Sequence, residues 1–334
     1  MADKNIEIRS ATTEQQKIAN GSTPGALAEP ELKREEEEKG KEKQRQQPPT
    51  ATTLVGRAPK LNKSPLHGLW ALTNRDLKKW YKNPIQLFIS LIQPVVWLGL
   101  FGKALNFGSF ISQSGVPSSV QGQIMQSTFG TSDYFSFLSA GMLSFIILFT
   151  AAFSGMSVVF DRRFGFLNKA LSTPVGRGAI VTSKVMQSVI RSLIQAAIVL
   201  GIAVLLGMRT SNMGILGIAG TFVILFLMSF GLSSLFVMLA LRSSDWQTQM
   251  AIINLLNLPL LFASNALLPV TLMPAWLQGV VKVNPVSYAN DATRQLLLGA
   301  TGMSSLAVDF AVLVAFAVIL SAMGIVLSWK LLSK

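Results

Sequence analysis

The segment Tyr134–Phe160, YFSFLSAGMLSFIILFTAAFSGMSVVF, runs for 27 residues without a charged side chain. A helix needs about 20 apolar residues to cross the hydrocarbon core of a bilayer. The composition of the chain fits that environment, because 50% of its residues are hydrophobic and only 13% are charged. Soluble domains carry about twice that charged fraction. The segment therefore predicts a membrane-spanning helix.

Five further apolar runs flank this segment, one before it and four after it. The first contains Pro94, which should kink a helix. The third has Arg191 near its start, where the side chain can snorkel or face the bundle interior. The sequence thus predicts an all-α polytopic membrane protein with six transmembrane helices, at 84–105, 134–160, 185–208, 215–241, 249–268 and 310–329.

The basic side chains between the spans predict an orientation. Residues 1–65 hold 12 of the 29 basic and 10 of the 16 acidic residues, so the rest of the chain carries a net charge of +11. With the N-terminus inside, the outer segments carry only Arg209, Lys282 and Arg294, with Lys103 at a membrane edge. This positive-inside bias predicts that both termini are cytoplasmic. Because these charges sit at the ends of apolar runs, they favour membrane lipids over nucleic acid as partners.

Three regions outside the spans have their own character. Residues 1–64 are too rich in Glu, Lys, Gln and Pro to fold alone and predict a disordered cytoplasmic tail. Residues 106–133 are rich in Ser, Gly and Gln and predict a solvated loop. Residues 269–302 are semi-apolar but interrupted by prolines, which predicts re-entrant or interfacial outer helices before the last span.

Residues 65–83 predict an amphipathic helix, with apolar residues at helical spacing on one face and basic residues on the other. Such a helix is suited to lie along the membrane surface. The residues expected at that surface are Trp70, Arg75, Lys78, Lys79, Trp80 and Lys82.

The sequence lacks the residue types and motifs that most kinds of enzyme catalysis need. The chain has no cysteine and a single histidine, His67, and no His/carboxylate set has metal-ligand spacing. No phosphate-binding loop of the form G-x-x-x-x-G-K-[ST] occurs. The sequence therefore predicts a non-enzyme without catalytic residues, metal or cofactor of its own.

The six acids after residue 65 lie in loops or at span edges, which argues against an ion-coupled secondary transporter. A secondary transporter or channel is nevertheless the alternative reading.

One cytoplasmic segment, Asp161–Val175, is unusual. Phe164, Leu167 and Leu171 form a short apolar stripe that Pro174 ends. A brief helix with exposed apolar residues needs either a protein partner or the bilayer surface, and the physical pattern favours neither.

Two motifs resemble a known family. The first is Asp161-Arg162-Arg163-x-Gly165 running to Leu171-Ser172-Thr173-Pro174-Val175, and the second is Asn284–Arg294, NPVSYANDATR. In their positions on a six-span plan they resemble permeases of the ABC type-2 transporter family, in the daunorubicin-resistance and nodulation-exporter-like branch of bacteria and some plastids. The resemblance covers about residues 66–334. Asp161 departs from it mildly, because glutamate is more usual there.

The resemblance implies a transport subunit of the plasma (inner) membrane. Two permease copies, forming a homodimer or heterodimer, would pair with two copies of a separate ATP-binding cassette subunit that holds ATP and Mg. Export of a drug, lipid or glycan would follow, and an apolar interior with scattered amides favours an amphiphilic cargo. The 65–83 helix would flank the contact with the ATP-binding subunit. The contact itself would be a coupling helix with Asp161, Arg162, Arg163, Phe164, Gly165, Leu167, Leu171 and Pro174.

The second motif has two open interpretations. It can form a capped outer helix in which Asp291 and Arg294 pair across i,i+3, or it can contact substrate directly. Its candidate residues are Asn284, Pro285, Tyr288, Asp291 and Arg294.

Overall fold

The computed structural model describes residues 65–332, apart from 105–112, 114, 116, 132, 174, 211–213, 244 and 301. The predicted tail at 1–64 and the predicted coupling residue Pro174 lie outside the described residues. Every regular element among the described residues is helical, as expected from the sequence. In chain order the first six are α3 (Pro65–Tyr81), α4 (Pro84–Ala104), α6 (Ser118–Phe129), α7 (Tyr134–Arg163), α8 (Phe166–Leu171) and α9 (Arg177–Leu205). The remaining six are α10 (Ile215–Arg242), α11 (Trp246–Phe262), η1 (Val270–Leu272), α12 (Ala275–Val281), α13 (Pro285–Leu298) and α14 (Leu306–Leu332).

Four helices among the described residues are long and apolar enough to cross a membrane, namely α7, α9, α10 and α14. They contain the second, fourth and sixth predicted spans and most of the third, which was predicted to end at residue 208 although α9 ends at Leu205. At the first predicted span α4 is a helix of 21 residues that ends at Ala104, whereas the helix at the fifth is shorter than predicted. The described apolar stretch of α4 is Leu87–Leu100, and α11 is 17 residues long. At a rise of about 1.5 Å per residue, 17 residues cover about 26 Å, somewhat less than the hydrocarbon thickness of about 30 Å.

The fifth predicted span was too long at its C-terminal end. Helix α11 ends at Phe262, and residues 263–268 follow as turns and bends rather than helix. Pro259 stands inside the last turn of α11, where its ring removes the N–H that would bond one turn back and so weakens the end of the helix. The break leaves backbone carbonyls without a partner in α11, and side chains of α13 and its cap donate hydrogen bonds to them.

Polar residues begin two of these helices. Asp133 accepts the backbone N–H of Ser136 at 3.1 Å and starts α7. Asp245 accepts the N–H of Thr248 at 2.8 Å and starts α11. Side-chain oxygens in this position satisfy donors that the first turn of a helix leaves unpaired.

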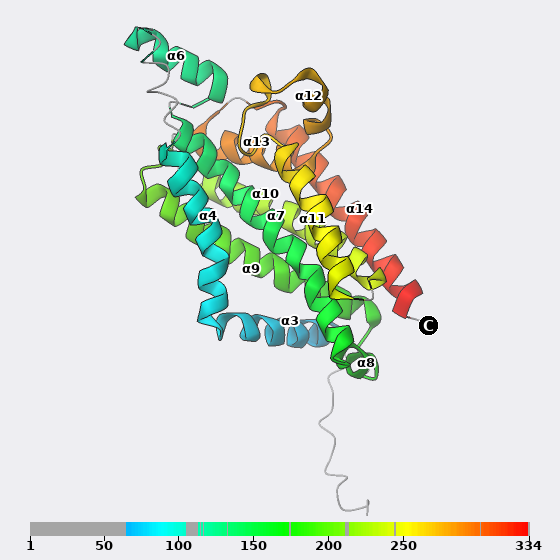
Figure 1. Cartoon of the computed structure of the whole chain (residues 1–334). Coiled ribbons are helices and arrows are strands. Elements are labelled where there is room, and N and C mark those ends of the chain that lie inside the picture. Colours follow the sequence, from blue (N-terminus) through cyan, green and yellow to red (C-terminus); the bar gives the residue numbers. More distant parts are fainter. Residues whose placement is uncertain are drawn as a thin grey trace, which may run out of the picture. The chain divides into compact units, whose positions relative to one another are not determined.

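Helix α7 is the central element and packs against α4, α9, α10, α11 and α13 (Figure 1). Its fully buried side chains include Leu138, Met142 and Phe145. Hydroxyl and amide side chains also cross the core: Thr150 donates to Gln195 at 2.7 Å, and Ser192 lies 2.7 Å from Ser229. Such hydrogen bonds between helices are characteristic of apolar bundles, in which polar side chains have few other partners.

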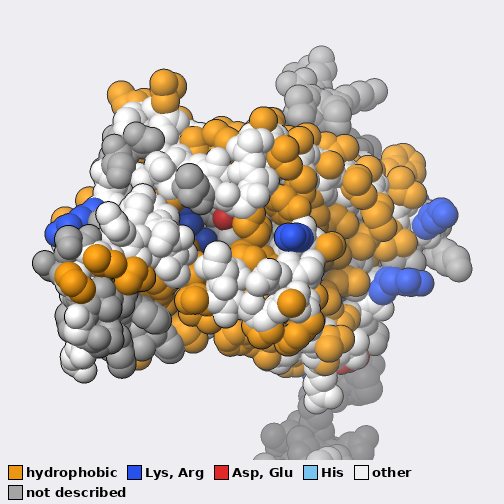
Figure 2. All heavy atoms as spheres, turned by 90° about the horizontal axis from the view of Figure 1, so that it is seen from above, with side chains coloured by type: hydrophobic (Ala, Val, Ile, Leu, Met, Phe, Trp, Pro, Cys, Tyr) orange, Lys and Arg blue, Asp and Glu red, His pale blue; other side chains and the backbone are white. Residues whose placement is uncertain are grey.

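The two ends of the bundle differ. At one end α3 lies across the ends of the long helices and leads into α4, and α8 lies near its other end (Figure 1). At the opposite end lie α12 and α13, which form from the proline-interrupted region 269–302 that was expected to hold short helices. Figure 2 looks onto that second end, where hydrophobic side chains cover much of the surface and charged atoms are few.

The prediction of a solvated loop at 106–133 was wrong for its second half. Residues Ser118–Phe129 form α6, which Gly130 ends in a left-handed conformation with φ 67°. The Phe129 ring packs edge-on against Tyr134 and Phe137, with centroids 5.5 and 5.3 Å away. This aromatic contact gives α6 an apolar anchor that its Ser- and Gln-rich composition concealed.

Candidate partner interface and outer cavity

A buried charge cluster joins three helices beneath α8. Lys184 of α9 donates to Asp76 of α3 at 2.5 Å and also to Asp161 of α7. Arg75 of α3 adds contacts of 2.6 Å to Asp76 and 3.2 Å to Asp161. Lys184 is only 5% exposed and Asp76 only 8%. Two cations thus face two carboxylates, so the buried charges balance.

Asp76 is held in its ionised form by these partners. Burial alone would raise the pKa of this carboxyl, but Lys184 and Arg75 outweigh that effect and lower the pKa below its ordinary value. Lys79, one turn along the exposed side of α3, lies 3.6 Å from the same carboxylate.

Arg162 fastens the end of α7 to the end of α10. Its Nη1 donates to the carbonyl of Ser243 and its Nη2 to that of Leu241, both at 2.8 Å. The last carbonyls of a helix have no partner within the helix and carry partial negative charge, so a guanidinium is well suited to bind them. Arg162 is therefore already occupied within this chain, whereas the neighbouring Arg163 is exposed.

The turn into α8 presents one aromatic ring to the outside. Gly165 adopts φ 70°, which only glycine takes without strain, and this turn reverses the chain after α7. Phe164 just before it is 78% exposed. Leu167 is 6% exposed and packs with Ala170 and Ile180, and Leu171 is partly buried in the same cluster. The expectation of an exposed stripe is thus met by Phe164 and is wrong for Leu167.

The rest of α8 is anchored to α3. The Arg75 guanidinium lies 3.6 Å from the ring centroid of Phe166, a cation–π contact. Leu72 of α3 also packs against the Leu167 cluster. Helices α3 and α8 are therefore two parts of one surface.

The expected membrane-facing residues of α3 fall into two groups. Trp70, Lys78, Lys79 and Lys82 are exposed, with Trp70 at 56%, and their place at the membrane surface stays a prediction. Trp80 is only 5% exposed, and Arg191 of α9 lies over its ring at 5.5 Å. Trp80 therefore packs within the protein, and its placement at the membrane surface was wrong. Arg75 is likewise half-buried in the charge cluster.

Sequence reasoning missed Asp76, Lys184 and Phe166 as parts of this site. Asp76 carried a usable signal, because it is the one acid in an otherwise basic helix. Lys184 carried none, because a lysine near a span end is equally typical of a loop charge that sets topology.

At the opposite end, the second motif forms α13 and binds it to the broken end of α11. The Asn284 side chain accepts the N–H of Val286 at 3.0 Å and donates to the carbonyls of Leu260 and Ala263 at 2.8 and 2.7 Å. Pro285 occupies the first turn, where its missing N–H costs nothing. The Tyr288 hydroxyl donates to the Lys282 carbonyl at 2.6 Å.

Asp291 and Arg294 bind other segments rather than each other. Asp291 accepts from the Asn265 side chain at 2.6 Å and from the Met303 N–H at 2.8 Å. Arg294 donates to the carbonyls of Phe137 and Ala266, and its guanidinium lies 3.6 Å from the Phe137 ring centroid. The capped helix was therefore expected correctly, but the i,i+3 ion pair was not found among the described residues.

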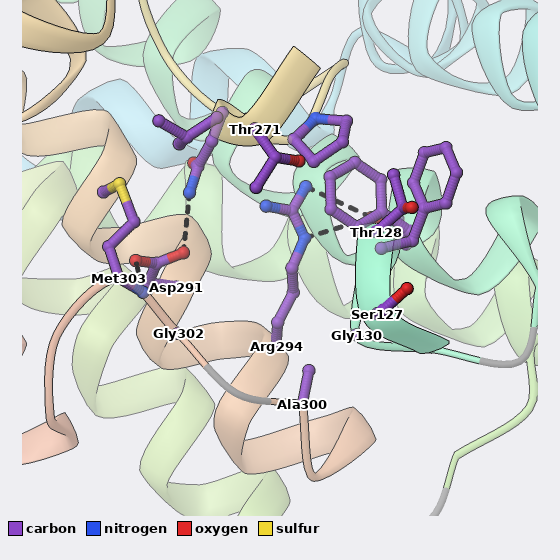
Figure 3. Close-up of a pocket in the computed structure, with 14 residues that line it drawn as sticks. Ser127, Thr128, Gly130, Thr271, Asp291, Arg294, Ala300, Gly302 and Met303 are labelled. Carbon is purple, nitrogen blue, oxygen red and sulfur yellow. Dashed lines mark hydrogen bonds between the residues drawn. The ribbon is translucent and has the colours of Figure 1, made fainter. Parts of the chain in front are cut away.

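These two side chains line a cavity of about 240 Å³ at the α12–α13 end of the bundle. Ser127, Thr128 and Gly130 contribute from the region of α6, Thr271 from η1, and Met303 from the loop after α13 (Figure 3). Drug-sized ligands generally occupy about 300–1,000 Å³. The cavity is therefore a small polar pocket rather than a passage for a large amphiphile.

Comparison with known proteins places both motifs in one family pattern. Residues 67–298 match the family model described as ABC-2 type transporter. The putative transport permease ycf38 of Pyropia yezoensis is 34% identical over 227 residues, which cover 68% of this chain and 72% of that protein. The ycf38 permease of Cyanophora paradoxa is 32% identical over 230 residues, covering 68% and 73%. The daunorubicin resistance ABC transporter permease protein DrrB1 of Streptomyces coeruleorubidus is 26% identical over 219 residues, covering 66% and 71%.

Proposed function

This chain belongs to the ABC-2 type transporter family, and from that premise we propose that it is the permease subunit of an ATP-driven exporter. Its ATP-binding cassette would be a separate protein that holds ATP and Mg. Relatives in Streptomyces coeruleorubidus and Mycobacterium tuberculosis are named as resistance ABC transporter permeases. The chain itself would contribute the membrane path and the contact that receives the ATP-driven movement.

The observation that carries this proposal is the 78% exposed ring of Phe164 on a firmly held turn. The neighbours of that ring are fixed within the chain, Arg162 by two carbonyls of the α10 end and Asp161 by Lys184. A large aromatic side chain that projects from a fixed support is the usual form of an anchor for a partner pocket. We assign Phe164 this role, with exposed Arg163 beside it.

The supports explain how a push on α8 would reach the bundle. Arg162 ties the α7 end to α10, and Lys184 ties α7 to α9 and α3. A displacement of α8 by a partner would thus move three membrane helices together with α3. Such rigid-body motion of linked helices is one of the standard forms of conformational switching.

In this proposal α4 and α11 are the first and fifth spans, which gives six spans with both termini in the cytoplasm of the plasma (inner) membrane. Ile85, Phe88, Ile89 and Ile92 of α4 are all exposed, which suits a surface covered by lipid or by a second permease copy. The proposed cargo is amphiphilic, a drug, lipid or lipid-linked glycan. An apolar core with scattered hydroxyls and amides supports that choice.

The experiment is co-expression with a candidate ATP-binding cassette subunit from the same organism, followed by co-purification and reconstitution. We expect a stable complex with vanadate-sensitive ATPase activity. Phe164→Asp should abolish both co-purification and coupled activity, whereas Phe164→Leu should retain them. Transport that persists without any nucleotide-binding partner and follows an ion gradient would contradict the proposal and favour a secondary carrier.

A further inference from the structure

A second cavity, separate from the α3–α8 surface and from the cavity beside Arg294, lies between the ends of α10 and α14. It measures about 510 Å³ and is lined by Met238, Leu239, Arg242, Ala322, Met323, Val326, Leu327 and Lys330. Six of these residues are apolar and two are cations, and no acidic residue is among them. The groove is at the same end of the bundle as α8, because Arg162 at the end of α7 binds the carbonyls of Leu241 and Ser243 beside Arg242.

The side chains of the groove are divided by chemistry along the helices. Arg242 and Lys330 stand in the last turns of α10 and α14 and are both exposed. Met323 and Val326, further from the ends, are 50% and 56% exposed and face outward as apolar surface. In a bilayer this arrangement places two positive charges at the depth of the lipid head groups, next to an apolar groove at the depth of the acyl chains.

We propose that this groove binds an anionic phospholipid from the leaflet on the α8 side. The phosphate lies between Arg242 and Lys330, and one acyl chain lies along Met323, Val326 and Leu327. Basic pockets between membrane helices are the sites that acidic lipid head groups favour. A zwitterionic lipid would fit the apolar part equally but would offer no net negative charge to the two cations.

A second copy of the chain fits this groove less well than a lipid. In a symmetric dimer each copy presents the same patch to the other. Arg242 and Lys330 of both copies would then meet in one interface, with no acidic residue of the groove to separate them. Such like-charge contacts oppose association.

The test uses the whole chain, purified from vesicles that contain equal amounts of phosphatidylglycerol and phosphatidylcholine, with retained lipid counted by native mass spectrometry. We expect the protein to retain phosphatidylglycerol preferentially. Because each Lys or Arg near an anionic surface contributes about fivefold, Arg242→Gln with Lys330→Gln should reduce this preference by about 30-fold. Exchanging the cations, Arg242→Lys with Lys330→Arg, should preserve it. Ala322→Phe, which fills the groove and keeps both charges, should also remove retained phosphatidylglycerol.

The matched control is Arg209→Gln with Lys282→Gln, which removes two exposed cations at the opposite end. This control should leave the preference unchanged. An equal loss in the control and in the groove variant would overturn the proposal, because the effect would then be one of net charge. The chain has no cysteine, so Met323→Cys adds a unique thiol. Efficient disulfide formation between two copies through that thiol would assign the groove to a dimer and overturn the lipid site.

Discussion

The Nζ of Lys184 on α9 lies 2.5 Å from Oδ2 of Asp76 on α3, and this contact connects residues that are 108 positions apart in the sequence. The same ammonium donates to Asp161 at the end of α7. One buried cation therefore connects the surface helix, the first long span and the helix after α8. The stability that Lys184 contributes depends on its charge being paired with the carboxylates of both Asp76 and Asp161.

Replacement of Lys184 by methionine should be strongly destabilising. Two carboxylates would keep only Arg75 and the more distant, exposed Lys79, and removing one partner from such a buried pair typically costs about 3–5 kcal/mol. Thermal unfolding in detergent would measure this. Lys184→Met combined with Asp76→Asn should recover part of the loss, because one unmatched charge disappears. Lys82→Met, which removes an exposed lysine from the same end, is the control and should have little effect. Equal melting temperatures for Lys184→Met and Lys82→Met would refute the role of the cluster.

Asp76 also predicts a pH dependence of stability. Its pKa in the folded chain is lowered, since Lys184 and Arg75 outweigh the effect of burial. An unfolded chain would hold this carboxyl near its ordinary pKa of about 3.9. The folded state therefore gains stability from Asp76 above about pH 4, and this gain is lost as pH falls through the lower folded pKa.

Melting temperatures measured between neutral and acidic pH should therefore fall more steeply for the parent chain than for Asp76→Asn. The variant should begin lower at neutral pH, and the two curves should converge in acid. Curves that stay parallel throughout would show that Asp76 is not the group responsible.

The contact with a partner predicts different outcomes for two neighbouring apolar residues. Phe164→Asp should leave folding unchanged, because the ring is 78% exposed, and should abolish co-purification with the ATP-binding subunit. Leu167→Asp should instead lower the melting temperature, because it buries a charge among Ala170 and Ile180. Gel filtration and melting of the permease alone, next to the co-purification assay, separate the two effects. A folded Phe164→Asp variant that still binds the partner would be inconsistent with the anchor.

The structure also shows which features of the fold and of the site could be predicted from the sequence. The long apolar runs fixed the all-helical class and four membrane-length helices, because a 27-residue uncharged run has few other uses. Capping of α13 by Asn284 was equally accessible, since an Asn-Pro pair is a local signal. Local patterns could not show which side of a helix meets the protein. Trp80 and Leu167 sit on apolar faces that fit a membrane or a partner as well as a core, and only tertiary packing placed them inside.

The long-range charge contacts were beyond the sequence for a different reason. Asp161 lies 23 residues before Lys184, and Asp76 108 residues before it, and no periodicity connects such distances. Arg294 likewise binds carbonyls of Phe137 and Ala266, 157 and 28 residues away. Backbone carbonyls have no sequence signature, so neither partner could be predicted, and only the Ala266 carbonyl belongs to the break after α11.

That break makes Gly141 the most sensitive glycine at the α13 end of the bundle. A Cβ on Gly141 would lie 2.2 Å from the carbonyl oxygen of Ala266, well inside contact distance, and the obstacle is backbone. The same oxygen accepts the 3.0 Å hydrogen bond from Arg294. Gly141→Ala should therefore force α7 away from the segment after α11 and weaken the Arg294 contact, at a typical overpacking cost of about 1–3 kcal/mol.

Gly201 is the matched control, because it is also helical but its Cβ would meet nothing within 4 Å. Gly201→Ala should leave the melting temperature unchanged or raise it slightly, as alanine favours helix over glycine by up to about 1 kcal/mol. Hydrogen exchange locates the damage. In Gly141→Ala the amides of α13 should lose protection first, because α13 carries Arg294, while those of α8 at the other end should stay protected. Loss of protection in α8 before α13, or equal destabilisation by the two alanines, would show that the Gly141–Ala266 approach does not stabilise the α13 end of the bundle.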